Sequence, residues 1–476
     1  MSHIETPAKD IVSLPLKGAY GTGTLVLNLL PASVSIFAFF LVTAYGMDPV
    51  LAGLLTGLPR IFDAITDPIM GFITDNTKSR WGRRRPYIVI GSILSGVLFA
   101  LMWQMDPEAS QQYNFWYFLL FSLAFTIGNT MFATPFVGLG YEITTDYNER
   151  TRLMAIAQFM GQIAWMIVPW FWVLIANPDL FETQAEGVQK MALIVGGICM
   201  ILGIVPGLFC KGIDSDHIDN TKEISLRTMG TNLVAIVKGI IQTFQNPSFV
   251  KLCAATFLIF NGFQLVSSFA YYIIVFHMYN GDYGAAGNWP AWYATASALM
   301  TAFFVIPIVS WMANKWGKRM AFIISTSISI VGYGLKWYGF TAGNTWMIFL
   351  PIPMFCFGIG GLFTLMLSMT ADVCDLDELK NGMPRREGTF AAIYWLMVKI
   401  GQAIAMILGG VVLSFVGFDQ SLAVQTAETM TKLRIADIVI PASTAALAIW
   451  VMWSYDLDED RARGIQKELI ERRGEL

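Results

Sequence analysis

Long apolar segments separated by short polar connections recur along the whole chain. Runs of about 18 or more apolar residues are long enough to cross a membrane as helices. Proline and glycine within several of them are compatible with membrane helices. The pattern predicts an all-α membrane protein with twelve transmembrane helices in two six-helix halves. The predicted segments are 20–45, 50–75, 86–105, 114–142, 152–177, 189–210, 248–278, 290–313, 320–340, 345–371, 388–416 and 436–455.

A longer polar connection divides the segments into six and six. We expect an N-terminal half over 1–211, a central cytoplasmic loop over 212–247, a C-terminal half over 248–456 and a cytoplasmic tail over 457–476. Leu226 to Phe244 has helical apolar spacing, which predicts an amphipathic helix lying on the membrane surface. The charged tail predicts a short helix.

The two halves share a short basic sequence. Arg80-Trp81-Gly82-Arg83-Arg84 follows the second segment, and Lys315-Trp316-Gly317-Lys318-Arg319 follows the eighth, at the same place in the other half. Two unrelated basic loops would not share the Trp-Gly pair. A parallel six-plus-six repeat is the architecture of major facilitator transporters.

Composition and charge agree with a membrane location. Hydrophobic residues make up 55% of the chain and charged residues 14%, against about 25% charged residues in soluble domains. Lys and Arg gather in alternate short connections, so the positive-inside rule places both termini in the cytoplasm. The loop 417–435, with Lys432 and Arg434, fits this rule least well. We expect a multi-pass protein of the cytoplasmic (inner) membrane that contacts lipid and functions as a monomer.

Enzymatic chemistry has no support in the sequence. The five cysteines lack metal-ligand spacing and the three histidines form no cluster. No Ser-His-Asp grouping, His-rich metal box or nucleotide-binding loop is present, so we expect neither an integral-membrane enzyme nor a nucleic-acid partner, and no cofactor apart from a coupling ion.

The second apolar segment carries three charges that share one helix face. Arg60, Asp63 and Asp67 fall within a narrow arc. A charge at membrane depth costs about 2.5–3.5 kcal/mol on insertion scales and marks a functional site. The two carboxylates would repel each other when dry, whereas a cation between them neutralises the pair. Lys399, in the middle of the eleventh segment, could instead pair with them when the ion is absent. In the alternative interpretation these charges only hold helices together.

Two sequence stretches resemble known transporters. Ser310 to Arg319 is similar to the major facilitator loop motif Gly-x-x-x-Asp-Arg-x-Gly-Arg-Arg, and the first copy begins with Gly71 and Asp75 but carries four extra residues. Arg60-Ile-Phe-Asp63-Ala-Ile-Thr-Asp67-Pro-Ile-Met-Gly71, with Met397-Val398-Lys399, resembles the glycoside–pentoside–hexuronide:cation symporter family of the major facilitator superfamily.

The resemblance implies a cation site and a solute site. In the family the paired carboxylates hold the coupling cation, and Thr66 and Thr130 align with positions that help to bind Na⁺. The acidic and basic positions that grip a galactoside in the family correspond here to Asn28, Ala133 and Gln158, so the galactoside pattern is absent. A less charged polar cavity remains, and each of its residues could equally be helix-packing contacts. The candidates are Asn28, Gln158, Gln162, Gln264, Phe363, Tyr394 and Trp395.

Further charged residues are candidates for gating or coupling. A carboxylate at one helix end and basic residues at the next helix start can form a latch on the cytoplasmic side. Simple solvated loops are the alternative. The candidates are Arg60, Lys399, Asp75, Arg83, Arg84, Glu142, Arg150 and Asp372.

The sequence thus predicts a cation-coupled symporter of a sugar, glycoside, uronide or related polar solute, working by alternating access. Na⁺ is the expected ion and H⁺ the alternative. A second alternative keeps the fold but carries a lysolipid or another non-sugar solute.

Overall fold

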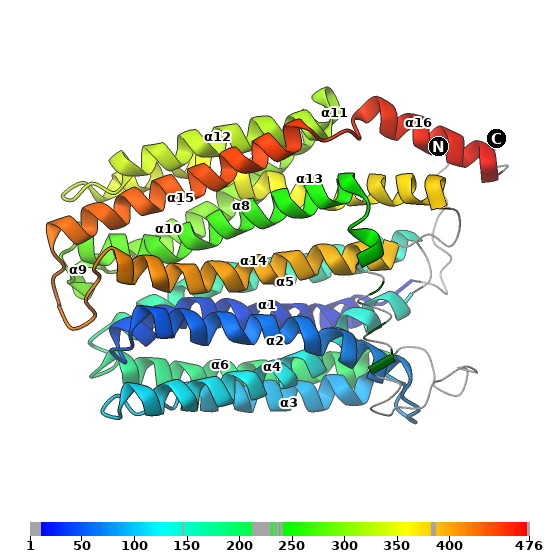
Figure 1. Ribbon diagram of the computed structural model, residues 1–476. Coiled ribbons are helices and arrows are strands. Elements are labelled where there is room, and N and C mark those ends of the chain that lie inside the picture. Colours follow the sequence, from blue (N-terminus) through cyan, green and yellow to red (C-terminus); the bar gives the residue numbers. More distant parts are fainter. Residues whose placement is uncertain are drawn as a thin grey trace. The chain divides into compact units, whose positions relative to one another are not determined.

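The computed structural model describes residues 11–144, 147–211, 230–231, 234, 238, 241–381 and 387–473. Throughout these residues the regular structure is helical. The chain divides into two compact units, Met1–Val234 and Ala235–Leu476. Figure 1 shows the helices of each unit running alongside one another.

Unit 1 contains six long helices. They are α1 (Leu14–Thr43), α2 (Pro49–Asp75), α3 (Arg85–Met102), α4 (Gln111–Glu142), α5 (Tyr147–Ala176) and α6 (Gln184–Phe209). Local sequence explains several of their starts. Asp48 accepts the backbone N–H groups of Val50 and Leu51, and Ser110 accepts that of Tyr113, so both residues cap their helices.

Unit 2 repeats this arrangement with more interruptions. Its helical elements are α8 (Pro247–Tyr272) with its π-helical continuation η3 (Ile273–Met278), α9 (Tyr283–Ala286), the continuous run α10 (Trp289–Met300), η4 (Thr301–Val305) and α11 (Ile306–Trp316), then α12 (Lys318–Gly339), η5 (Thr345–Phe349), α13 (Ile352–Asn381), α14 (Glu387–Phe415), α15 (Ala427–Trp453) and α16 (Glu459–Arg473).

Each of the twelve predicted segments coincides with a long helix or a continuous helical run. Among the described residues, eleven helical segments are long and apolar enough to cross a membrane. The twelfth, α2, is as long as the others at 27 residues but is less apolar because it carries Arg60, Asp63 and Asp67. The predicted helix in the tail is confirmed by α16.

Two predicted loops are wrong in part. Helix α15 begins at Ala427, so Lys432 and Arg434 lie within its first turns, where Lys432 pairs with Glu428 one turn earlier. Helix α13 continues to Asn381, so the acidic residues from Asp372 onward are helical rather than part of a solvated loop. Their charge had suggested a loop, but these side chains are buried, and Asp372 is stabilised there by its ion pair with Lys318. Most of the predicted amphipathic helix 226–244 lies outside the described residues.

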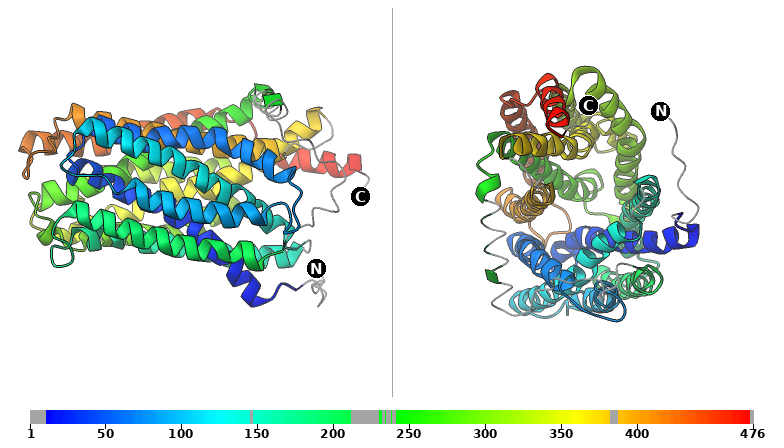
Figure 2. Two further views of the ribbon diagram at one scale, coloured as in Figure 1. Left: turned by 90° about the horizontal axis from the view of Figure 1, so that it is seen from below. Right: turned by 90° about the vertical axis from the view of Figure 1, so that its right-hand side faces the viewer.

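The internal repeat extends to helix packing. In unit 1, α1 packs against α5 and α6, α3 packs against α4 and α6, and α2 packs against α4. In unit 2, the corresponding helices repeat these pairings: α8 packs against α14 and α15, α12 against α13 and α15, and α11 against α13. The end-on view in Figure 2 shows the helices of each unit gathered as a bundle.

The shared Trp-Gly sequence has the same backbone conformation in both copies. Gly82 has φ of 84° and Gly317 has φ of 80°, in the left-handed region that favours glycine. Each glycine lies just before the third long helix of its unit, where the chain reverses direction. The repeat therefore conserves a sharp turn as well as basic charge.

Candidate functional site

The candidate cation site lies where α2 meets α4. Thr130 Oγ1 on α4 donates to Asp63 Oδ1 on α2 at 2.9 Å. Thr66 Oγ1 is 3.1 Å from Thr130 Oγ1 and also lies 3.2 Å from the Asp63 carbonyl oxygen. Asp63 is buried, while Thr66 is half-buried. Three of the four predicted cation-site residues are thus in direct contact.

The fourth predicted residue, Asp67, lies one turn further along α2 and is half-buried. Its Oδ1 accepts a hydrogen bond from Thr134 Oγ1 at 3.3 Å. Sequence reasoning missed Thr134, although its spacing could have revealed it. Thr130 and Thr134 are four residues apart, as are Asp63 and Asp67, so successive turns of the two helices face each other.

This group of atoms suits a hard cation. It combines two carboxylates with hydroxyl oxygens, which are the oxygen ligands that hard ions prefer. Within the described parts of the chain, no three His, Cys, Asp or Glu side chains gather as a metal cluster. Because all of these donors are oxygens, the set fits a hard cation better than a soft transition metal.

The predicted solute-site residues of unit 1 lie on α1 and α5. Trp165 Nε1 on α5 donates to Asn28 Oδ1 at 3.1 Å, and Asn28 Nδ2 donates to the Thr24 carbonyl at 2.9 Å. Gln158 and Gln162 are exposed on successive turns of α5. Asn28 therefore already has helix-packing contacts, whereas the two glutamines remain open to a ligand.

The predicted solute-site residues of unit 2 differ in exposure. Phe363 on α13 and Trp395 on α14 are exposed, and Gln264 on α8 is half-buried. Tyr394 is fully buried with its ring packed at right angles to that of Trp395. Lys399, also on α14, is half-buried. Packing within the unit accounts for Tyr394, whereas the exposed aromatic rings offer stacking faces.

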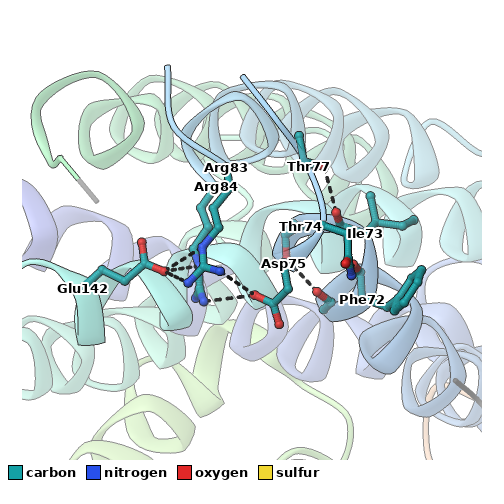
Figure 3. Close-up of polar contacts among 10 residues, drawn as sticks. Phe72, Ile73, Thr74, Asp75, Thr77, Arg83, Arg84 and Glu142 are labelled. Atoms are coloured by element: carbon teal, nitrogen blue, oxygen red, sulfur yellow. Dashed lines mark hydrogen bonds and ion pairs between the residues drawn. The ribbon is translucent and has the colours of Figure 1, made fainter. Parts of the chain in front are cut away.

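A charge cluster joins the ends of α2 and α4 to the turn before α3. Arg83 Nη2 lies 2.5 Å from Glu142 Oε1, and Arg84 Nε lies 2.9 Å from the same oxygen. Arg84 Nη2 is 3.2 Å from Asp75 Oδ1 (Figure 3). The four extra residues between Asp75 and Arg80 therefore do not prevent the carboxylate from reaching the basic pair.

Unit 2 has a related contact. Lys318, which occupies the place of Arg83 in the repeat, lies 2.6 Å from Asp372 Oδ2 near the end of α13. These contacts place the predicted gating residues Asp75, Arg83, Arg84, Glu142 and Asp372 in ion pairs. The side chain of Arg150 lies outside the described residues.

A second buried carboxylate at the same end of unit 1 was not predicted as a site residue. Glu149 is fully buried, accepts the Val12 N–H at 3.1 Å and pairs with Lys17 and Arg152. The hydrogen bond from Lys17 holds the pKa of the Glu149 carboxyl below its usual range. It ties the segment before α1 to the start of α5.

A buried ion pair in unit 2 was also missed. Lys336 on α12 lies 2.5 Å from Asp437 on α15, and both side chains are almost completely buried. Each residue lies in a largely apolar helix, and a charge within an apolar segment is the signal that identified Arg60, Asp63 and Asp67. The pair became visible only when the fold brought the two helices together.

Comparisons with known proteins place the chain among transporters. Residues 19–459 match the family described as MFS/sugar transport protein. An uncharacterised symporter from Synechocystis is 25% identical, with 90% of this chain and 91% of that protein covered. An isoprimeverose transporter from Lactiplantibacillus pentosus is 24% identical, with coverage of 95% and 90%. A sodium-dependent lysophosphatidylcholine symporter from Danio rerio is 23% identical, with coverage of 90% and 83%.

Solved structures show the same fold. A bacterial homologue of the human lysosomal transporter Spinster, in an inward-facing and unoccupied conformation, matches with a TM-score of 0.66 at 17% identity and covers 93% of this chain and 98% of its own. The predicted major facilitator fold is confirmed by this likeness and by the family match. The chain is an integral multi-pass membrane protein that belongs to the MFS/sugar transport protein family of the major facilitator superfamily.

Proposed function

We propose that this protein is a cation-coupled symporter that carries a sugar, glycoside, uronide or related polar solute by alternating access. The observation that carries the proposal is the pairing of Asp63 and Asp67 on α2 with Thr130 and Thr134 on α4. Two carboxylates at membrane depth are costly unless they have a task. A cation that neutralises them would link its own gradient to movement of the solute.

Na⁺ is the ion that the site supports best. A proton needs only a carboxylate, whereas Na⁺ needs several oxygen ligands around it. Thr66 and Thr130 bring two hydroxyl oxygens within 3.1 Å of each other beside Asp63. These hydroxyls would be redundant in a site built for a proton alone.

The charge cluster of Asp75, Arg83, Arg84 and Glu142 supports a gating role. With both termini in the cytoplasm, as the distribution of basic loops indicates, the cluster lies at the cytoplasmic end of unit 1. It holds the ends of α2 and α4 together through the turn before α3. Such a connection would stabilise one conformation of the transport cycle.

A polar solute agrees with the exposed candidates and with the family. Gln158 and Gln162 offer amide hydrogen bonds, and Phe363 and Trp395 offer faces on which a sugar ring can stack. The isoprimeverose transporter is among the related proteins. A lysolipid is the second candidate because the lysophosphatidylcholine symporter is also related.

The test is solute accumulation in proteoliposomes that contain the purified protein. An inward Na⁺ gradient should drive accumulation of a radiolabelled glycoside or uronide from a candidate panel. Asp67→Asn should abolish accumulation, because the site loses one of its two negative charges, while solute exchange without a gradient can persist. Accumulation that follows a pH gradient and ignores Na⁺ would identify a proton symporter. Accumulation of lysolipid in place of every sugar tested would overturn the solute class.

A further inference from the structure

A small cavity lies inside unit 1 next to Asp63. It is about 30 Å³ in volume and is lined by parts of α1, α2, α3 and α4. Asp63 lines it, whereas Thr66, Asp67 and Thr130 do not. A cavity needs about 10–15 Å³ to hold a water molecule, so this one has room for at least one.

The cavity wall contains a cation that has no direct contact with an acceptor. Arg60, one turn before Asp63 on α2, makes no hydrogen bond or ion pair with any residue in the described ranges, and the attraction of Asp63 acts on it across a longer distance. A guanidinium carries five N–H donors. At membrane depth such a group needs an acceptor.

The rest of the wall supplies acceptors, which lie on α4 and, for Thr56, on α2 itself. Asn129 Oδ1 on α4 is buried and has no hydrogen-bond partner within the described part of the chain. The hydroxyls of Thr56, Ser122 and Thr126 each donate to a backbone carbonyl of their own helix, at 3.0, 2.9 and 2.9 Å. Because their protons are used in this way, these oxygens can face the cavity only as acceptors.

Donors and acceptors thus border one void without meeting each other. Each buried polar group left unsatisfied costs about 1–3 kcal/mol. A water molecule can accept from Arg60 and donate to acceptors at the same time, and buried waters typically make about three such bonds. The remaining lining residues, such as Phe118 and Phe125, are apolar and confine the occupant to the polar part of the wall.

We propose that this cavity binds one water molecule, which bridges Arg60 to Asn129 and Asp63 and so positions the Asp63 carboxylate for the coupling cation. The role of the water rests on the proposed function. Arg60 would then act on Asp63 through the water rather than by direct pairing. In this arrangement the water orients the Asp63 carboxylate, which can still bind the cation. Asn129 is a positioning residue in this arrangement.

Radiolytic hydroxyl labelling tests the occupant directly. Radicals formed from a trapped water oxidise the side chains around it even when bulk solvent does not reach them. Met102 and Phe118 line the cavity and are each 1% exposed, whereas Met191 at 5% and Phe132 at 0% do not line it. We expect Met102 and Phe118 to be oxidised several-fold faster than Met191 and Phe132, respectively. Equal rates within both pairs would show that the cavity is dry and would overturn the proposal.

A substitution tests the role of the water. Asn129→Leu keeps the approximate volume and removes the acceptor. It should slow Met102 labelling and raise the Na⁺ concentration for half-maximal uptake several-fold, with solute KM at saturating Na⁺ unchanged. Asn129→Gln keeps an amide and should restore part of the Na⁺ response. Ile127→Leu, at an exposed position of α4 that does not line the cavity, serves as the control.

The outcomes separate this inference from the proposed function. If the parent protein shows no Na⁺ response, the Na⁺ assignment of the proposed function fails, and the positioning role fails with it even if labelling detects a water. If uptake depends on Na⁺ but Asn129→Leu leaves that dependence unchanged, only the positioning role is overturned. If solute protects Met102 from labelling, the cavity belongs to the solute site and the water assignment is wrong.

Discussion

At the scale of single residues, Asp63 and Asp67 lie on successive turns of α2, and each accepts a hydrogen bond from a threonine of α4. The hydroxyl oxygens can serve a cation as neutral ligands beside the two charged ones. Removing one hydroxyl should therefore weaken ion binding without destroying the site. Removing a carboxylate should instead abolish coupling.

Thr130→Val tests this directly, because valine has nearly the same shape but no hydroxyl. We expect the Na⁺ concentration for half-maximal uptake to rise about tenfold, which corresponds to about 1.4 kcal/mol and is the usual order for one lost polar interaction. The measurement is initial uptake rate against Na⁺ at fixed pH. Uptake driven by a pH gradient, where present, should be spared. An unchanged Na⁺ dependence would remove Thr130 from the site.

Glu149 gives a prediction about pH. Its folded-state pKa lies below that of an unfolded chain, so the carboxylate stabilises the fold above the unfolded pKa, and this stability is lost as pH falls through the folded pKa. Glu149→Gln keeps the shape but leaves the buried Lys17 without its charge partner. The variant should have a lower thermal unfolding midpoint at neutral pH, and the difference from the parent should shrink in acid.

Arg152→Gln is the control for Glu149, since Arg152 is 61% exposed and an exposed pair contributes about 0–1 kcal/mol. The thermal unfolding midpoint of Arg152→Gln should stay close to that of the parent. Thermal unfolding in detergent across a pH series measures all three proteins. If Glu149→Gln lowers the thermal unfolding midpoint by the same amount at every pH, the change in shape rather than the loss of charge explains the effect.

At this scale the sequence revealed charges but not all of their partners. Asp63, Thr66, Asp67 and Thr130 were predicted as a cation site, and three of them are in direct contact. Thr134 was missed because a threonine in a membrane helix is ordinary, and only its four-residue spacing from Thr130, which matches that of Asp63 and Asp67, singles it out. The cavity beside Arg60 could not be predicted, because it depends on how four helices pack.

At the scale of elements, hydrophobic periodicity identified the long helices because a membrane helix must satisfy its own backbone. Helix ends were less certain, since charge was taken to indicate a loop. Helices α13 and α15 extend into charged sequence because their acidic and basic residues find partners, as Asp372 does with Lys318. The shared packing order of the two units could be expected only from the short Trp-Gly repeat.

The buried pair Lys336–Asp437 connects α12 and α15. Removing one partner leaves an uncompensated buried charge, which costs about 3–5 kcal/mol. Lys336→Met and Asp437→Leu should each destabilise the protein strongly, whereas the double variant should lose much less than the sum. Thermal unfolding of the parent and the three variants measures this coupling. Additive losses would mean that the two charges do not support each other.

At the scale of the whole molecule, a transporter must change conformation. Contacts at helix ends therefore affect how populated each conformation is, as well as the stability of the fold. The cluster of Asp75, Arg83, Arg84 and Glu142 joins two long helices through one turn. Removing a contact made in only one conformation shifts the equilibrium toward the others. The cluster therefore gives a means of testing alternating access.

Charge reversal in Arg83→Glu should break the 2.5 Å contact with Glu142 and place two carboxylates side by side. We expect the outward-open conformation to become less populated. A cysteine introduced at Gln158, which is exposed on α5, reports this change in conformation. The five native cysteines are buried. Labelling by a membrane-impermeant thiol reagent from the extracellular side should fall. Labelling from the cytoplasmic side should rise.

Lys78→Glu is the matched control for Arg83→Glu, because it reverses a charge in the same turn at an exposed position. It changes the loop charge equally but leaves the contacts of Arg83 and Arg84 in place, so its labelling should resemble that of the parent. If both variants shift labelling alike, the total charge of the loop determines how populated the outward-open conformation is. If neither variant shifts it, the basic turn serves membrane topology alone, and gating must depend on other residues.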